Sequence, residues 1–359
     1  MCALLSFLFL VLLLSGVCSA SQAGLDDSVP SLTEQTTVLV LTREQMADLA
    51  RRAEAGEAEA QFIWGAAFRD GGPLVKRNQV EAAKWFRRAA DQGFAKAENE
   101  LGQMYLRGSG VPRDYAQALH WYTKAEQDGS AVAASNIGYL YYTSKGVSRS
   151  YTLAFQWFSK AAASGVAAAQ YAIGYMLRIG QGVRRDPVQA ARLQHAAAEK
   201  GLLDSQLELA TMYYRGEGVA RDFTEALHWF LAAARQGNAL AQNNAGYLYA
   251  TGIGGTRDYA EALRWFTAAA EQGDPEAQAN LGDMYQKAHG VPLDYVEAYK
   301  WFSLAIAQGH SLAASARRSI STIMTKRQLE AAEIRVSEWQ RQHPRTATQS
   351  GVAREQTDP

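Results

Sequence analysis

Apolar and polar positions follow a helical period along most of the chain, and the same pattern returns every 36 residues. Ala97, Leu101 and Tyr105 lie at spacings of four residues, which indicates one apolar stripe on an amphipathic helix. Ala133, Ile137 and Tyr141 repeat this stripe 36 residues later. A recurrence at a fixed period is typical of a repeat architecture, so the chain is predicted to be a tandem array of small units.

Each unit contains a second helix with small and aromatic residues in a fixed register. An alanine lies eleven residues before a glycine that closes the unit, and in six units a tryptophan follows this alanine by three residues. Alanine lets two helix backbones approach closely, and the ring three residues along fills the space beside it. The alanines are Ala82, Ala118, Ala154, Ala190, Ala226, Ala262 and Ala298, and the tryptophans are Trp85, Trp121, Trp157, Trp229, Trp265 and Trp301.

The ends of the second helices are marked by capping residues. Side chains that can accept a hydrogen bond from an orphan helical N–H stand at Asn78, Asp114, Ser150, Asp186, Asp222, Asp258 and Asp294. Glu or Gln follows by three residues in all units but the third, which has Leu153, so six reciprocal capping boxes are predicted. The predicted C-terminal stops are Gly93, Gly129, Gly165, Gly201, Gly237, Gly273 and Gly309.

The units resemble Sel-one-like repeats, which are relatives of the tetratricopeptide repeats. The shared pattern reads Ala-x-x-x-Leu-Gly-x-x-Tyr, then Gly-x-Gly-Val-x-x-Asp-Tyr, then Ala-x-x-Trp-Phe and a closing Ala-x-x-x-Gly. The resemblance implies an all-α fold, a right-handed α-solenoid of stacked antiparallel helix pairs. It also implies a scaffold or adaptor that binds a protein partner. We expect this chain itself to be a monomer.

The repeats are expected at 57–93, 94–129, 130–165, 166–201, 202–237, 238–273 and 274–309. A capping helix is predicted over 42–56 and a capping helix pair over 310–342, because a stacked array needs polar outer faces at its ends. Residues 24–41 are interpreted as a linker and 343–359 as a disordered tail. The fourth unit has Leu193-Gln194 in place of a tryptophan and an aromatic ring, so its junction is expected to pack less tightly.

The first 23 residues are interpreted as a cleaved signal peptide, because Leu4 to Leu14 form a short apolar run followed by small residues. The ending Met324-Thr325-x-x-Gln328-Leu329 followed by Glu338-Trp339 is similar to the final helix of many bacterial members of the Sel-one-like repeat family, which implies a bacterial source. Cleavage is expected near Ala20 or Ala23, and export would place the protein in the periplasm or outside the cell. Lipid anchoring at Cys18 and an uncleaved anchor stay open, and so does peripheral membrane or cell-wall association. Cleavage would leave no cysteine in the mature chain.

Charge and motifs argue against several other functions. Lys and Arg (36) balance Asp and Glu (36), which gives no reason to expect a nucleic acid partner. His120 and His228 share a helical slot with Lys84 and Arg264, so we interpret them as exposed side chains and expect no metal or cofactor site. No catalytic residues are assigned. A cell-wall or β-lactam hydrolase remains the alternative class, although the paired cysteines of such relatives are missing here.

A partner surface is predicted on the concave side, where the first helix of each unit carries residues that vary among units. The candidate residues are Asn99, Gln103, Tyr139, Tyr142, Tyr171, Tyr175, Arg178, Tyr214, Asn243 and Tyr247. One slot holds Tyr139, Tyr175 and Tyr247 but Asp283 in the last unit, and a buried slot would not be expected to accept Asp. These tyrosines are therefore expected to face solvent and to contribute to binding rather than to folding. A surface factor that binds a host protein is a variant of this hypothesis.

Overall fold

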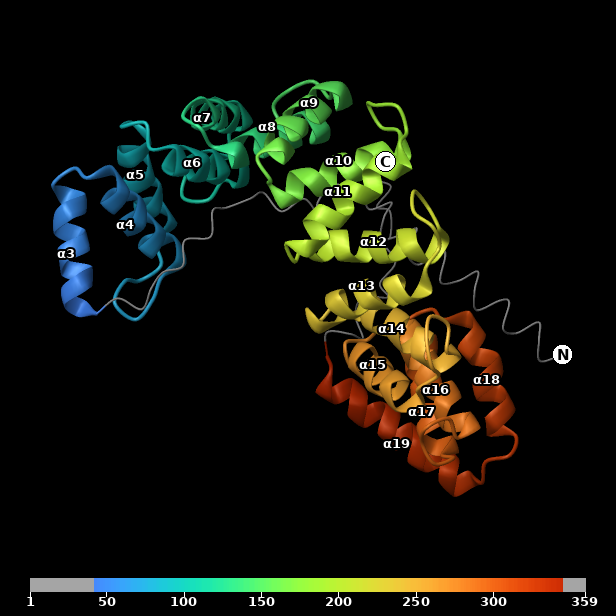
Figure 1. Ribbon diagram of the computed structural model, residues 1–359. Coiled ribbons are helices and arrows are strands. Elements are labelled where there is room, and N and C mark those ends of the chain that lie inside the picture. Colours follow the sequence, from blue (N-terminus) through green and yellow to red (C-terminus); the bar gives the residue numbers. More distant parts are fainter. Residues whose placement is uncertain (1–41, 345–359) are drawn as a thin grey trace, which may run out of the picture. The chain divides into compact units, whose positions relative to one another are not determined.

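The computed structural model describes residues 42–344, and within this range all regular elements are helices (Figure 1). The chain divides into two compact units, the first ending at Leu202 and the second beginning at Leu203. The boundary falls at the end of the fourth repeat. The looser packing expected where the fourth repeat meets its neighbour stays a prediction. The predicted signal peptide and linker lie outside the described residues, as does the tail after residue 344.

The first unit begins with the predicted capping helix and continues with four helix pairs. Each helix from α4 to α10 packs against the helices before and after it in sequence. The helices are α3 (Arg43–Glu54), α4 (Ala58–Asp70), α5 (Gln79–Ala90), α6 (Ala95–Arg107), α7 (Tyr115–Gln127), α8 (Ala131–Thr143), α9 (Tyr151–Ala163), α10 (Ala167–Ile179) and α11 (Pro187–Glu199).

The second unit contains three helix pairs followed by two closing helices. Here α17 contacts both α18 and α19, so the last pair covers the end of the stack. The helices are α12 (Leu203–Arg215), α13 (Phe223–Arg235), α14 (Ala239–Thr251), α15 (Tyr259–Glu271), α16 (Pro275–Lys287), α17 (Tyr295–Ala307), α18 (Ser311–Ser321) and α19 (Lys326–Gln342). Within residues 42–344, none of the helices has the length and apolar character that crossing a bilayer requires.

The predicted N-caps are confirmed, but the reciprocal capping boxes of the repeats are not. All seven N-cap side chains accept a backbone N–H. Within the described residues, the return bond from the third helical residue is made at Thr42–Gln45 and Thr325–Gln328, in the capping helices. In the repeats several of these acidic side chains pair with a base one turn further on, as Glu81 does with Lys84.

Close helix packing explains the small residues of the repeat. A methyl group added to Gly102 would lie 2.7 Å from the ring of Tyr122, so this glycine lets α7 pack directly on α6. Five of the six repeat tryptophans are buried, and Trp157 is half-buried. In the fourth repeat the residue against Gly174 is Gln194, which is fully buried and donates a hydrogen bond to the Tyr171 carbonyl at 3.2 Å.

Candidate functional site

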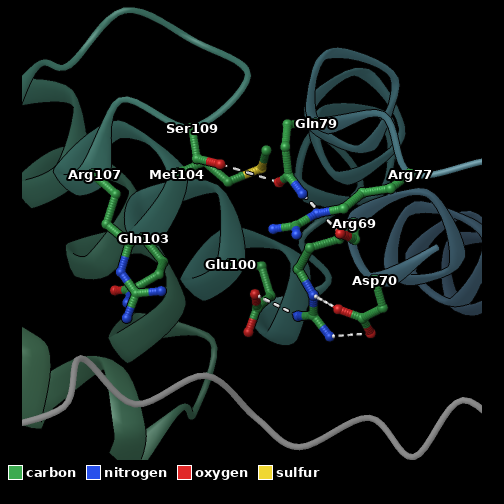
Figure 2. A pocket seen from close by; sticks show the side chains of 9 residues that line it. All are labelled: Arg69, Asp70, Arg77, Gln79, Glu100, Gln103, Met104, Arg107 and Ser109. Atoms are coloured by element: carbon green, nitrogen blue, oxygen red, sulfur yellow. Dashed lines mark hydrogen bonds and ion pairs between the residues drawn. The ribbon is translucent and has the colours of Figure 1, made fainter. Parts of the chain in front are cut away.

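A cavity of about 400 Å³ lies in the first unit beside the C-terminal ends of α4 and α6 (Figure 2). The end of α4 supplies two charged residues, α6 supplies four residues of mixed character, and the rest come from the start of α5 and the adjoining loops. The lining residues are Arg69, Asp70, Arg77, Gln79, Glu100, Gln103, Met104, Arg107 and Ser109. The cavity therefore lies where the first two repeats pack together.

Arg69 is fixed by two carboxylates. Its Nε and Nη2 donate to Asp70 at 2.8 and 2.9 Å, and its Nη1 donates to Glu100 Oε2 at 2.8 Å. The hydrogen bonds that Arg69 donates to Asp70, together with the charge of Glu100, raise the pKa of Arg69 above its usual value although burial opposes this shift. Only 18% of the Arg69 side chain and 1% of the Glu100 side chain are exposed, so this pair is a partly desolvated link between α4 and α6.

The wall opposite Arg69 combines the neutral amide of Gln103 with the guanidinium of Arg107. Gln103 is buried and accepts a hydrogen bond of 2.7 Å from the hydroxyl of Tyr122. Burial raises the pKa of Tyr122 well above its usual value, so this hydroxyl stays a neutral donor. Arg107 lies beside Gln103, and both Arg107 and Arg77 are exposed to solvent (Figure 2). The cavity thus presents two exposed guanidinium groups above a closed network of hydrogen bonds.

Hydrogen bonding in the cavity suits binding rather than nucleophilic catalysis. Ser109 Oγ donates to Gln79 Oε1 at 3.0 Å, and Gln79 Nε2 donates to the Arg69 carbonyl at 2.7 Å. A serine is activated as a nucleophile by a neighbouring base, and an amide is not a base. In residues 42–344 no three His, Cys, Asp or Glu side chains are placed to hold a metal ion. The chemistry that these residues support is the recognition of an anionic group.

The structure places the ten predicted partner residues in two groups. Six of them are buried: Asn99, Gln103, Tyr139, Tyr142, Tyr175 and Asn243. The other four are half-buried: Tyr171, Arg178, Tyr214 and Tyr247. Gln103 is the only one of the ten that lines this cavity. Whether any of these residues binds a partner stays a prediction.

The prediction that the tyrosine slot faces solvent is wrong for Tyr139 and Tyr175, which are 6% and 8% exposed. Polar groups in this slot are buried with partners instead. The Tyr139 hydroxyl accepts a hydrogen bond from Lys145 at 2.6 Å, and Gln103 in the equivalent position accepts from Tyr122. Asp283 is accepted because its slot is half-buried and Lys287 pairs with it at 2.7 Å.

Buried amides elsewhere in the predicted surface hold successive repeats together. Asn136 Nδ2 donates to Asn99 Oδ1 at 2.8 Å, and Asn280 Nδ2 donates to Asn243 Oδ1 at 2.9 Å. Each bond joins the first helices of two consecutive repeats within one unit. The variation of the Asn99 and Asn243 positions among repeats therefore does not indicate that these residues bind a ligand.

The sequence reasoning missed the arginines of the cavity. Arg69 stands 37 residues before Leu106, in the repeat slot that also holds Tyr142 and Arg178. That slot varies among the repeats, but the first repeat is one residue longer than the others, so Arg69 lies outside the 36-residue register. Arg77 lies in that longer connection and has no periodic position that would have identified it.

The described fold and its repeated capping, packing and turn residues define an α-helical repeat protein made of stacked helix pairs. The Sel1 repeat pattern matches seven times, at residues 58–94, 95–130, 131–166, 167–202, 203–238, 239–274 and 275–310. The chain therefore belongs to the Sel1 repeat family. Each match begins and ends one residue after the repeat bounds expected from the sequence.

The solved structure of a relative agrees with this assignment. A Sel1 repeat protein from Oxalobacter formigenes is 34% identical, with 79% of this chain and 83% of that chain covered and a TM-score of 0.59. A protective antigen with this fold from uropathogenic Escherichia coli strains is 27% identical over 88% of this chain and 83% of that chain, with a TM-score of 0.42. A comparison with curated proteins gave no match.

Proposed function

We propose that this chain is an exported, non-catalytic binding protein whose partner is another protein. The cavity beside Arg69 receives an acidic group of that partner. The observation that carries this proposal is that three arginines line one cavity and that the side chains of two of them, Arg77 and Arg107, are exposed. The third, Arg69, is held in place by Asp70 and Glu100.

Arginine suits this role because its planar guanidinium donates two parallel hydrogen bonds to a carboxylate. A balanced charge over the whole chain, with 36 basic and 36 acidic residues, favours a local acidic contact over a polyanion such as nucleic acid. Four of the predicted partner residues are half-buried and retain contact with solvent: Tyr171 and Arg178 in the first unit, and Tyr214 and Tyr247 in the second. We propose these four as secondary contacts with the partner. The proposed binding requires no cofactor.

The test begins with capture of partners from a cell-envelope extract on the purified chain, followed by identification and a titration of affinity. Reversing the cavity charge with Arg77→Glu and Arg107→Glu together should weaken binding about tenfold or more, since charge reversal places like charges against an acidic group. A matched control carries Arg318→Glu and Arg327→Glu, two exposed arginines of the second unit, and changes the net charge by the same amount. Equal affinity of the two double variants would rule out the cavity as the binding site.

A further inference from the structure

A hydrogen-bonded pair of glutamine side chains recurs at the same place in four of the seven repeats. In the first repeat, Gln92 at the end of α5 donates to Gln61 in the first turn of α4 at 2.7 Å. Gln61 in turn donates to the Ala53 carbonyl at the end of α3 at 3.1 Å. One buried amide thus ties together the ends of three helices.

The second unit contains three more of these pairs. The bonds join Gln236 to Gln206 at 2.7 Å, Gln272 to Gln242 at 2.7 Å, and Gln308 to Gln278 at 2.9 Å. Gln242 and Gln278 also donate to the carbonyls of Ala234 and Ala270, each at 3.2 Å. An amide serves this position because it is a donor and an acceptor at once and carries no charge.

The second repeat replaces both amides with acids. Glu98 lies in the first turn of α6 and Asp128 follows α7, in the positions of Gln61 and Gln92. Glu98 is 0% exposed, and neither of its carboxyl oxygens has a hydrogen-bond partner. Two ionised carboxylates supply no donor, so the link that the glutamine pairs make in four repeats cannot form between them.

The charged groups that act on Glu98 come from the end of α7. Burial is the main cause that raises the pKa of Glu98, from its ordinary 4.5 to about 7, and the charge of Asp128 adds to it. Lys124 opposes the shift, but its Nζ lies 3.6 Å from Glu98 Oε1 and is partly exposed. On the α5 side the residue in the position of Ala53 is Ala90, whose carbonyl can only accept a hydrogen bond.

We propose that Glu98 and Asp128 form a proton-dependent link between α5, α6 and α7, which is closed when Glu98 is neutral and loosened when it is ionised. A neutral Glu98 supplies the one donor that the pair lacks, because its carboxyl O–H can donate a hydrogen bond to the carboxylate of Asp128 or to the Ala90 carbonyl. Loss of the proton leaves a buried charge facing a second carboxylate. The glutamine pairs of the other repeats have no such dependence on pH.

The direction in which pH changes the stability of this link follows from the proton-linkage relation. The pKa of Glu98 is higher in the folded chain than the ordinary 4.5, so the stabilisation is fully present below pH 4.5 and is lost as the pH rises through about 7. Between these values the local opening constant should increase by up to about tenfold per pH unit, because opening releases one proton. Acid therefore tightens this junction.

Hydrogen exchange of the intact chain, corrected for the intrinsic effect of pH, measures this opening. Peptides from residues 95–128 should lose protection between about pH 5 and about pH 8, relative to peptides from α14 and α15. Glu98→Gln should abolish the relative loss, because it installs the amide of the other repeats. Asp128→Asn places an amide donor beside Glu98 and removes the charge of Asp128. This variant should therefore move the loss of protection to lower pH.

The converse substitution provides a matched test. Gln242→Glu places a buried carboxyl opposite Gln272 at an equivalent junction, and it should create a loss of protection with rising pH in α14 and α15. If wild type and Glu98→Gln lose protection equally across this range, the proposal is wrong. A Gln242→Glu chain whose protection does not respond to pH would also overturn it, and this outcome does not depend on whether Glu98→Gln folds.

Discussion

Tyr139 shows how a side chain with the composition of a binding residue can belong to the core. This residue is 6% exposed, and Lys145 Nζ, 4.7 Å from the ring centroid, donates a hydrogen bond of 2.6 Å to the hydroxyl. Tyr139→Ala should therefore lower the free energy of unfolding by about 3 kcal/mol, as loss of a large buried ring does. Tyr139→Phe keeps the ring and should cost about 1 kcal/mol. Urea unfolding followed by circular dichroism would measure both, and an unchanged midpoint for Tyr139→Ala would contradict the burial.

The residues of this slot also mark where reasoning from sequence stopped. A position that holds tyrosine, glutamine or aspartate in different repeats was predicted to be exposed, since an isolated buried carboxylate is costly. The sequence could not show that Gln103 has the Tyr122 hydroxyl as a partner, or that Asp283 has Lys287. Burial of polar groups depends on such partners from other helices, and these are known only after the helices are packed.

Connections between helices depend on two glycines with different requirements. Gly110, in the turn after α6, has a φ of +72°, and an added Cβ would lie 2.1 Å from the Gln79 carbonyl oxygen at the start of α5. Gly129, after α7, has a φ of +95° but nothing within 4 Å of an added Cβ. Gly129→Ala should thus cost about 1–2 kcal/mol from backbone strain alone.

Gly110→Ala should be clearly more destabilising, because the turn must also move away from α5 of the preceding repeat. Thermal unfolding of the two variants side by side would compare these costs. Similar midpoints would mean that the turn of the second repeat does not need its close approach to the first.

For single helices and turns, the sequence was sufficient to predict where each helix begins and ends. Helix starts at residues such as Asp258 and stops at residues such as Gly273 depend on neighbours within one turn, so local spacing was enough to predict them. The reciprocal bond predicted at Glu81 was not found, because Lys84 lies within 2.6 Å of its carboxylate and competes for it. The cavity beside Arg69 needed residues from two repeats and an irregular connection, which a periodic pattern does not describe.

Over the whole molecule, a stack of helix pairs has ends that must be covered, and α19 covers the end of the second unit. Trp339 lies edge-on to Trp301 with ring centroids 6.3 Å apart, and its Nε1 donates to Glu271 at 3.1 Å. Together with Val336 it belongs to the buried cluster that contains Leu304 of α17. This apolar surface would face water if the helix were absent.

A chain that ends at Met324 should accordingly bind a hydrophobic dye and elute as aggregates in size-exclusion chromatography, since an exposed apolar patch of this kind promotes association. Trp339→Ala removes the central anchor while keeping the helix, and it should reduce the stability of the second unit by about 3–5 kcal/mol. Lys326→Ala, on the same helix but almost fully exposed, should change it by less than about 0.5 kcal/mol. A monomeric chain without α19 that binds no dye would show that the repeats close their own end, and the aromatic pair would then have to serve another purpose.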